Sequence, residues 1–300
     1  MKKKAPKKSA PLTYEEAVAL HESGKKLSNE QILEIYRLAY AYDLGERHLQ
    51  CDHVKALELY RMAAAHGDHY AEFAVGLCYY YGRGCDVDYT NAVEWYQRAA
   101  DHGNREAMHN LANCYYYGEG CEKDLAKHIY WLKRAVKKGD SLAMWTLSTR
   151  YRYGEGVRKN LPAAIRWIIK SAEGGCAWGQ YDLSCYYRKG IGVEQNDELE
   201  FFWAMKAAEQ GDEYAQNSVG VAYAEGSFVT KDSKIALQWF RRAAKKQNEE
   251  AAYNLAIHYE EGDGVEQNYK EALRWYRLAD KWGKEGVEED INRMKALIRA

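Results

Sequence analysis

Apolar and aromatic residues recur along this chain with a period of 36 residues, and mostly polar or charged residues separate them. One column of the self-alignment consists of a leucine followed by tryptophans: Leu59, Trp95, Trp131, Trp167, Trp203, Trp239 and Trp275. A second column is wholly tyrosine: Tyr79, Tyr115, Tyr151, Tyr187, Tyr223 and Tyr259. Self-similarity at a fixed period of this length indicates a repeat architecture, so each period is one structural unit.

Each unit predicts a pair of helices joined by turns. The first segment, helix A, carries small or apolar residues at i, i+4 and i+8, as in Ala107, Leu111 and Tyr115, which therefore share one face. The second segment, helix B, follows a column of Asp or Asn, residues that cap a helix and stabilise it by about 1 kcal/mol. This capping column comprises Asp52, Asp88, Asp124, Asn160, Asn196, Asp232 and Asn268.

Glycine follows both helices of the unit, because the residue after a helix often adopts a left-handed conformation that penalises a Cβ. After helix B the column is Gly67, Gly103, Gly139, Gly175, Gly211 and Gly283, and after helix A it is Gly82, Gly118, Gly154, Gly190, Gly226 and Gly262. Gln247 interrupts the first column, so we expect its junction to be less stable.

Two further columns predict how the helices pack. Helix A has a column of small residues, which allows a neighbouring helix to approach closely: Gly76, Ala112, Ser148, Ser184, Gly220 and Ala256. We assign the tryptophans of helix B to packing between units rather than to ligand binding. Truncation of one tryptophan to alanine is then expected to cost about 3 to 5 kcal/mol.

The unit is clearest at residues 248–283, which contain the leucine and tyrosine of helix A, a G-x-G-V turn and an Asn before K-x-A-x-x-W. It resembles the Sel-one-like repeat (SLR), a relative of the tetratricopeptide repeat (TPR). Six such units span residues 68–283, and an irregular first unit, 28–67, keeps the A-A-x-x-G ending. Three residues in the interval 176–247 depart from the pattern: Gly179, Glu200 and Phe228.

This resemblance implies an all-α fold, a right-handed α-α superhelical solenoid of 36-residue helix-turn-helix repeats, whose members act as adaptors and carry no chemistry. We expect residues 1–12 to form a disordered basic tail and residues 13–27 a capping helix that begins with a capping box of Thr13 and Glu16. Residues 284–300 predict a second capping helix, with four apolar residues on one face: Ile291, Met294, Leu297 and Ile298.

Composition narrows the functional classes. Lys and Arg number 43 and Asp and Glu 44, so the net charge gives no general attraction to nucleic acid or to an anionic membrane. No apolar run reaches the length of a membrane span, and the lysine-rich start lacks the apolar stretch of a secretory signal. Seven cysteines without a C-x-x-C pair favour reduced thiols. We therefore expect a cytoplasmic monomer without cofactor or metal.

A ligand-binding face is predicted on helix A, opposite its packing face. We define this A-helix face as positions 70, 73, 74, 77, 80 and 81 and their equivalents, which line the inner groove in TPR-like stacking. Its aromatic and amide residues suit a peptide or protein partner. The candidate partner-binding residues are Tyr70, Phe73, Tyr81, His109, Asn113, Tyr117, Trp145, Thr149, Arg152, Trp178, Tyr181, Arg188, Asn217 and Tyr253.

The A-helix face is graded along the sequence, from aromatic through basic to acidic residues. We expect a bound segment to place acidic groups against Arg152 and Arg188. An equally weighted interpretation is that several tyrosines at the ends of helix A, such as Tyr80 and Tyr116, pack between adjacent A helices instead.

Other functions were weighed against a protein-binding scaffold. Single-stranded RNA binding is the runner-up, because helix-pair repeats can stack bases on aromatic groups, but the groove ends in acidic residues such as Glu260. A carbohydrate ligand stacked on the aromatic units is a third hypothesis. His66, His69 and His102 have no spacing typical of a metal site, and no nucleophile is paired with a base, so an enzyme is not expected.

Overall fold

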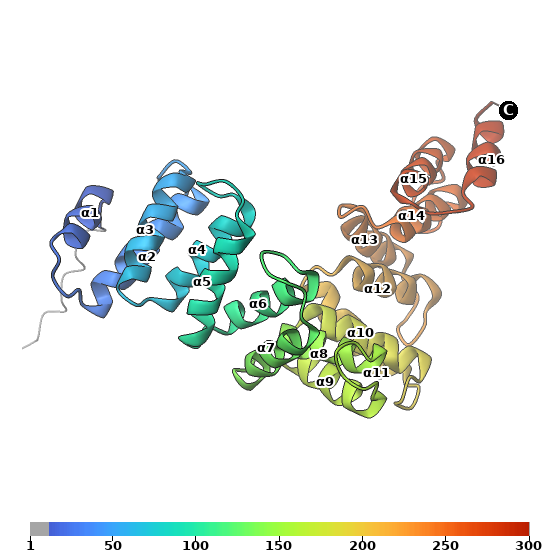
Figure 1. The fold of residues 1–300 in the computed structure, drawn as a ribbon. Coiled ribbons are helices and arrows are strands. Elements are labelled where there is room, and N and C mark those ends of the chain that lie inside the picture. The colour runs from blue at the N-terminus through green and yellow to red at the C-terminus, as the bar shows by residue number, and fades with distance from the viewer. Residues whose placement is uncertain (1–11, 300) are drawn as a thin grey trace, which may run out of the picture. The chain divides into compact units, whose positions relative to one another are not determined.

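The computed structural model describes residues 12–299 and contains sixteen α-helices and no β-strand in that range (Figure 1). The predicted basic tail, residues 1–12, lies outside the described residues apart from Leu12, which packs against the first hydrophobic core. The helices belong to two compact units, Met1–Asp140 and Ser141–Ala300.

The first unit contains α1 (Tyr14–Glu22), α2 (Asn29–Leu44), α3 (His53–Ala65), α4 (His69–Tyr81), α5 (Tyr89–Asp101), α6 (Arg105–Tyr117) and α7 (Leu125–Lys137). The second contains α8 (Ser141–Tyr153), α9 (Leu161–Glu173), α10 (Ala177–Lys189), α11 (Asp197–Glu209), α12 (Glu213–Glu225), α13 (Ser233–Ala244), α14 (Glu249–Glu261), α15 (Tyr269–Trp282) and α16 (Glu288–Arg299). Even-numbered helices from α4 to α14 are A helices, and the odd-numbered helix after each is its B helix. Within each unit every helix of these pairs packs against the next one along the chain, so the fold is the predicted α-α solenoid (Figure 1).

The predicted N-caps and left-handed glycines are confirmed. Each Asp or Asn of the capping column accepts a hydrogen bond from a backbone amide in the first turn of its B helix. Both glycine columns have positive φ, and Gln247, the exception, has φ 64° in the same left-handed region. The chain therefore keeps the turn geometry at Gln247 although the side chain disfavours it.

A second glycine in the turn after helix A brings that turn against the preceding B helix. A Cβ on Gly84 would lie 2.2 Å from the carbonyl oxygen of His53, and one on Gly120 would lie 2.0 Å from that of Tyr89. Each of these oxygens belongs to the first residue of a B helix, so only glycine permits such an approach.

The tryptophan column packs between repeats as predicted, but most of its members are only partly buried. Trp239 of α13 packs against the core formed by α11 and α12, and Trp275 of α15 against the core formed by α13 and α14. Trp131 is buried, with 5% of its surface exposed. A basic side chain covers several of the indoles, as where the guanidinium of Arg242 lies 4.5 Å from the ring centre of Trp239.

Large buried side chains also occupy the position after each tryptophan, which the sequence analysis did not single out. Six of its seven members are large and buried: Tyr60, Tyr96, Leu132, Ile168, Phe240 and Tyr276. The small residues of helix A make room for them within each pair. A Cβ on Gly76 would lie 2.6 Å from the ring of Tyr96, and one on Gly220 would lie 2.5 Å from the ring of Phe240.

The helices at both ends carry part of the predicted packing. Thr13 and Glu16 form the expected capping box at α1, and Ala17 is fully buried. In α16, Ile291 and Met294 are buried against the core of α14 and α15. The prediction was wrong for Leu297, which is 41% exposed because it lies beyond the last buried turn of α16.

Phe240→Ala is expected to lower the free energy of unfolding by about 3 to 5 kcal/mol, because it empties the site opposite Gly220. Trp239→Ala is the matched comparison and is expected to cost less, since its indole is only partly buried. Urea denaturation followed by circular dichroism measures both. A loss for Trp239→Ala as large as that for Phe240→Ala would contradict the assignment of the main core contact.

Gln247→Gly is expected to raise the free energy of unfolding by about 1 kcal/mol, because glycine adopts the left-handed conformation without a Cβ penalty. The control is Lys246→Gly, one residue earlier in the same turn, which is expected to destabilise. Thermal melts of the two variants beside the wild type test this, and an unchanged or lower midpoint for Gln247→Gly would refute it.

Candidate peptide-binding face

In the first unit, three tyrosines of the A-helix face are exposed. Tyr70 at the start of α4, Tyr81 at its end and Tyr117 at the end of α6 are 54%, 59% and 65% exposed. The guanidinium of Arg83 lies 5.4 Å from the ring centre of Tyr81. These rings present apolar surface to solvent, as anchors for a partner do.

Other members of this face pack within the first unit. The ring of Phe73 packs against Tyr96 with centroids 5.8 Å apart. The hydroxyl of Tyr80 donates to a carboxylate oxygen of Glu119 at 2.6 Å, and burial together with that bond raises the pKa of Tyr80. Tyr80 therefore packs within the chain, although the rings beside it, those of Tyr89 and Tyr96, lie on the B helix α5 and not on an adjacent A helix.

The structure corrects the prediction for His109. This residue is buried, with 8% of its surface exposed, and burial lowers the pKa of its imidazole. His109 therefore belongs to the packed interior and does not line a groove. Asn113, one turn further along α6, is partly buried and lines a small recess of about 100 Å³ with Tyr80 and Tyr81.

In the second unit, a hydrogen bond recurs between each even-numbered helix and the next even-numbered helix. It joins the residue at the position of Phe73 with the residue of the next helix at the position equivalent to 74. The indole of Trp145 donates to Asp182 at 2.6 Å, and the amide of Asn254 donates to Asn217 at 3.0 Å. The two other bonds of this ladder join Tyr181 to Ser218 and Tyr253 to Asp290.

This ladder changes the role of four predicted binding residues, Trp145, Tyr181, Asn217 and Tyr253. Their polar atoms are used between repeats, so what they offer to a ligand is their ring faces or their remaining hydrogen-bonding groups. The ring of Tyr253 also lies 5.4 Å from that of Tyr276 on α15, the B helix of the same repeat.

Two aromatic side chains project from this ladder into solvent. Trp178 at the start of α10 is 53% exposed and lies 5.2 Å from the ring of Trp145, and Tyr214 at the start of α12 is 50% exposed. Tyr214 stacks on Tyr181 with an interplanar angle of 24°. The four rings border a recess of about 280 Å³, whose remaining lining is acidic: Asp182, Asp212 and Glu213.

Burial raises the pKa of two carboxyl groups of this recess, those of Asp182 and Asp212. Burial raises the pKa of Asp182, while the hydrogen bond from Trp145 and the charge of Arg152 act in the opposite direction. Burial also raises the pKa of Asp212, which caps α12 by accepting the amide of Ala215. An added positive charge in the recess would therefore be favourable.

The basic residues of the predicted gradient already have partners inside the chain. The guanidinium of Arg152 lies 5.0 Å from the ring centre of Tyr186, and that of Arg188 lies 3.7 Å from a carboxylate oxygen of Glu200. The hydroxyl of Thr149 donates to the carbonyl of Thr146. In the last repeat Glu260 accepts hydrogen bonds from Arg293 at 2.8 Å, which lowers its pKa. A partner's acidic groups would have to compete with Glu200 for Arg188.

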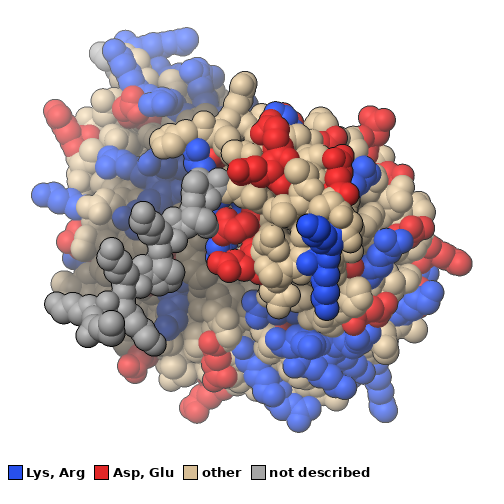
Figure 2. All heavy atoms as spheres, turned by 90° about the vertical axis from the view of Figure 1, so that its left-hand side faces the viewer, with Lys and Arg blue, Asp and Glu red and all other residues tan. Residues whose placement is uncertain are grey.

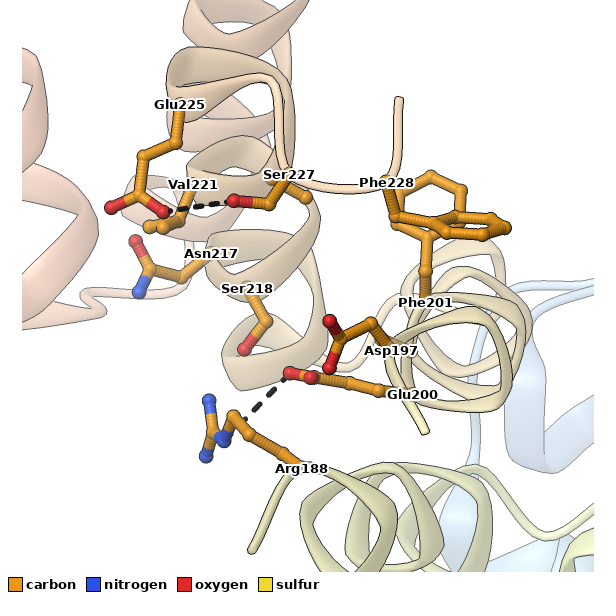
Figure 3. Close-up of a pocket in the computed structure, with 12 residues that line it drawn as sticks. Arg188, Asp197, Glu200, Phe201, Asn217, Ser218, Val221, Glu225, Ser227 and Phe228 are labelled. Carbon is orange, nitrogen blue, oxygen red and sulfur yellow. Dashed lines mark hydrogen bonds and ion pairs between the residues drawn. The ribbon is translucent and has the colours of Figure 1, made fainter. Parts of the chain in front are cut away.

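A larger recess of about 320 Å³ lies among α10, α11 and α12 (Figure 3). Its polar lining includes Arg188, Asp197, Glu200, Asn217, Glu225 and Ser227. Phe201 and Phe228 contribute aromatic rings with centroids 6.0 Å apart, and Ala204 contributes a small side chain. We name this recess the Ala204 cavity. Sequence reasoning noted the departures at Glu200 and Phe228 but missed Ala204, because it aligned the tryptophans and not the column that follows them.

Two cysteines, Cys78 on α4 and Cys114 on α6, are buried. Burial raises the pKa of both thiols to about 12, so these thiols are unreactive near neutral pH.

Within residues 12–299 no group of His, Cys, Asp and Glu could hold a metal ion, and no helix there is long and apolar enough to span a membrane. On the face seen in Figure 2, basic and acidic side chains are interspersed.

Comparison with known proteins agrees with the repeat pattern and the fold. The family model for the Sel1 repeat matches seven consecutive segments: residues 35–68, 69–104, 105–140, 141–176, 179–212, 213–248 and 249–279. The chain belongs to the Sel1 repeat family. No curated protein gives a match.

Solved structures of Sel1 repeat proteins are similar. A protective antigen of uropathogenic Escherichia coli with an SLR fold is 30% identical with a TM-score of 0.75; the match covers 94% of this chain and 59% of that antigen. A Sel1 repeat protein from Oxalobacter formigenes is 29% identical with a TM-score of 0.73, over 82% of this chain and 99% of that one. The immunity protein PA5088 of Pseudomonas aeruginosa, 18% identical with a TM-score of 0.53 over 80% and 88% of the two chains, shares the fold. This chain thus spans about three fifths of the antigen's length.

Asp182→Asn is expected to stabilise the protein relative to the wild type in a pH-dependent way. The folded-state pKa of Asp182 is raised, so ionisation destabilises the fold as the pH rises from the ordinary value of 3.8 through the raised pKa. The asparagine oxygen still accepts from Trp145 but carries no charge.

The difference in free energy of unfolding between the variant and the wild type should therefore grow with pH over that window and then become constant. Urea denaturation of both proteins at a series of pH values measures it. A difference that is independent of pH, or that shrinks as the pH rises, would show that the charge of Asp182 does not destabilise the folded state.

Proposed function

We propose that this chain is a protein-interaction scaffold that binds an extended segment of a partner protein along the A-helix face of its second unit. Sel1 repeat proteins are generally protein-interaction scaffolds, which supports the class of function. The position of the binding site is supported by the recess bordered by the exposed rings of Trp178 and Tyr214.

The physical reason is the combination of exposure and rigidity. Trp178 and Tyr214 each sit in the first turn of an A helix, and their neighbours Trp145 and Tyr181 are fixed by hydrogen bonds to the next repeat. Rings held in this way lose little conformational entropy on binding and offer large apolar area. Three carboxylates in the same recess add electrostatic preference for a segment with basic side chains.

This charge pattern revises the partner expected from the sequence. The acidic groups of the ligand were predicted to face Arg152 and Arg188, but neither residue lines this recess, and acidic groups bound there would be repelled by Asp182, Asp212 and Glu213. The same carboxylates disfavour a phosphate backbone, so the recess gives no support to RNA binding. The cytoplasmic location, the monomeric state and the absence of enzymatic activity expected from the sequence stay predictions.

Selection of random peptides displayed on phage against the purified chain tests this function. Enriched peptides are synthesised, and their affinity is measured by fluorescence anisotropy for the wild type and for the double variant Trp178→Ala/Tyr214→Ala. Loss of two central aromatic anchors is expected to weaken binding by at least about tenfold. The control is Phe202→Ala, since Phe202 is similarly exposed, at 47%, but lies on a B helix.

Equal weakening by Phe202→Ala, or unchanged affinity in the double variant with an intact circular dichroism spectrum, would reject the A-helix face as the binding site. Labelled oligo-uridine in place of the peptide gives the RNA comparison. Binding of oligo-uridine that is lost in the double variant would replace the protein-binding function with RNA binding.

A further inference from the structure

Three departures from the repeat pattern meet around the Ala204 cavity. The first is Ala204 itself, in the column whose other members are large and buried. In the first unit Tyr96 of that column reaches the next A helix and hydrogen-bonds Asn110. The equivalents in α11 and α12 are Ala204 and Ser218, both small, and both line the cavity. The cavity therefore lies where other repeats place a large side chain.

The second departure is Glu200, which replaces an alanine. Five of the other six repeats have alanine at this position: Ala56, Ala92, Ala164, Ala236 and Ala272. The carboxylate of Glu200 reaches from α11 toward Arg188 of α10, and Asp197 lies on the preceding turn of α11 (Figure 3). Burial raises the pKa of Glu200, so its charge is incompletely compensated in this setting.

The third departure is Phe228, at the turn position where Gly84, Gly120 and Gly264 touch the backbone of the preceding B helix. Phe228 keeps the left-handed conformation of those glycines, with φ 64°, although this conformation is energetically unfavourable for a bulky residue. Its Cβ prevents the same close approach to α11. The turn thus leaves space beside Asp197, and the ring of Phe228 borders the opening.

Each departure changes the packing that the other repeats share, and all three residues line one recess. Strain and lost packing that gather at one place are typical of a functional site. Within the cavity, the three carboxylates of Asp197, Glu200 and Glu225 exceed the single guanidinium of Arg188. The rings of Phe201 and Phe228 supply the aromatic surface that complements a cation.

We propose that the Ala204 cavity is the specificity pocket of the scaffold and that it binds the basic side chain of an arginine in the partner segment. The guanidinium would pair with Glu200 and Asp197 and contact the rings of Phe201 and Phe228. Arginine fits better than lysine, because its planar group can pair with a carboxylate through two hydrogen bonds and lie on an aromatic ring. This inference rests on the proposed peptide-binding function and adds the chemistry of the ligand to it.

The five phenylalanines of the chain provide reporters for a direct test: Phe73, Phe201, Phe202, Phe228 and Phe240. The intact protein is labelled with 4-fluorophenylalanine, and the resonances are assigned by single Phe→Leu variants. Fluorine NMR spectra are then recorded during titration with Nα-acetyl-arginine amide. The control ligand is Nα-acetyl-citrulline amide, which has nearly the same shape but no charge.

We expect arginine amide to shift the resonances of Phe201 and Phe228 and to leave that of Phe73 unchanged. Two variants introduce residue types that other repeats have at the same positions. Ala204→Phe fills the cavity and should abolish the shifts, while Glu200→Ala removes the carboxylate and should weaken binding by about tenfold. Because both variants restore residue types found in other repeats, we expect both to fold, which circular dichroism verifies.

The inference is overturned if citrulline amide causes the same shifts, if the shifts persist in folded Ala204→Phe, or if no shift occurs with probe up to about 100 mM, well above a weak millimolar dissociation constant. The phage experiment separates this failure from failure of the proposed function. If peptide affinity depends on Trp178 and Tyr214 but is unchanged by Glu200→Ala, the peptide-binding face is retained and the arginine pocket is rejected.

Discussion

The contact on which the other packing depends is the one between a small residue of each A helix and a large side chain of its B helix. Where the ring of Phe240 faces Gly220, the ring lies so close to the backbone of α12 that a Cβ on Gly220 would collide with it. This approach fixes the separation of the paired helices, and the tryptophan beside the ring is thereby set at the junction with the preceding repeat. The partly buried indoles and the exposed A-helix face both follow from that geometry.

Loss of this contact in one repeat explains the most unusual region of the protein. At α11 this position holds Ala204 in place of a large residue, and Ala204 lines a cavity. Elsewhere the chain compensates its departures locally. Gly179 replaces an alanine, and a Cβ there would lie 2.3 Å from the hydroxyl of Ser171, which itself donates to the carbonyl of Ser141. The larger side chain of Ser171 thus compensates for the smaller one at Gly179, whereas the departures around Ala204 leave open space and unbalanced charge.

The period, the caps and the turns could be predicted from the sequence because each depends on a local property of one residue. Asp52 accepts an amide of its own helix, and Gly67 adopts a conformation that its own lack of a Cβ permits. The face of helix A was likewise predicted by helical spacing. The sequence did not show which residues of that face are exposed. His109 is buried, and Trp145 is bonded to Asp182, because these outcomes depend on side chains of neighbouring helices.

The ladder between successive even-numbered helices also has a consequence for the order of the repeats. Its bonds join a different pair of residue types at each junction: indole with carboxylate, phenol with hydroxyl, amide with amide, and phenol with carboxylate. Removal of the 36 residues from α10 to the turn after α11 would place the indole of Trp145 opposite Ser218 in place of Asp182. The repeats of the second unit share one backbone plan, but each junction has its own pair of bonded side chains, so exchange or removal of a repeat changes the hydrogen bonds between its neighbours.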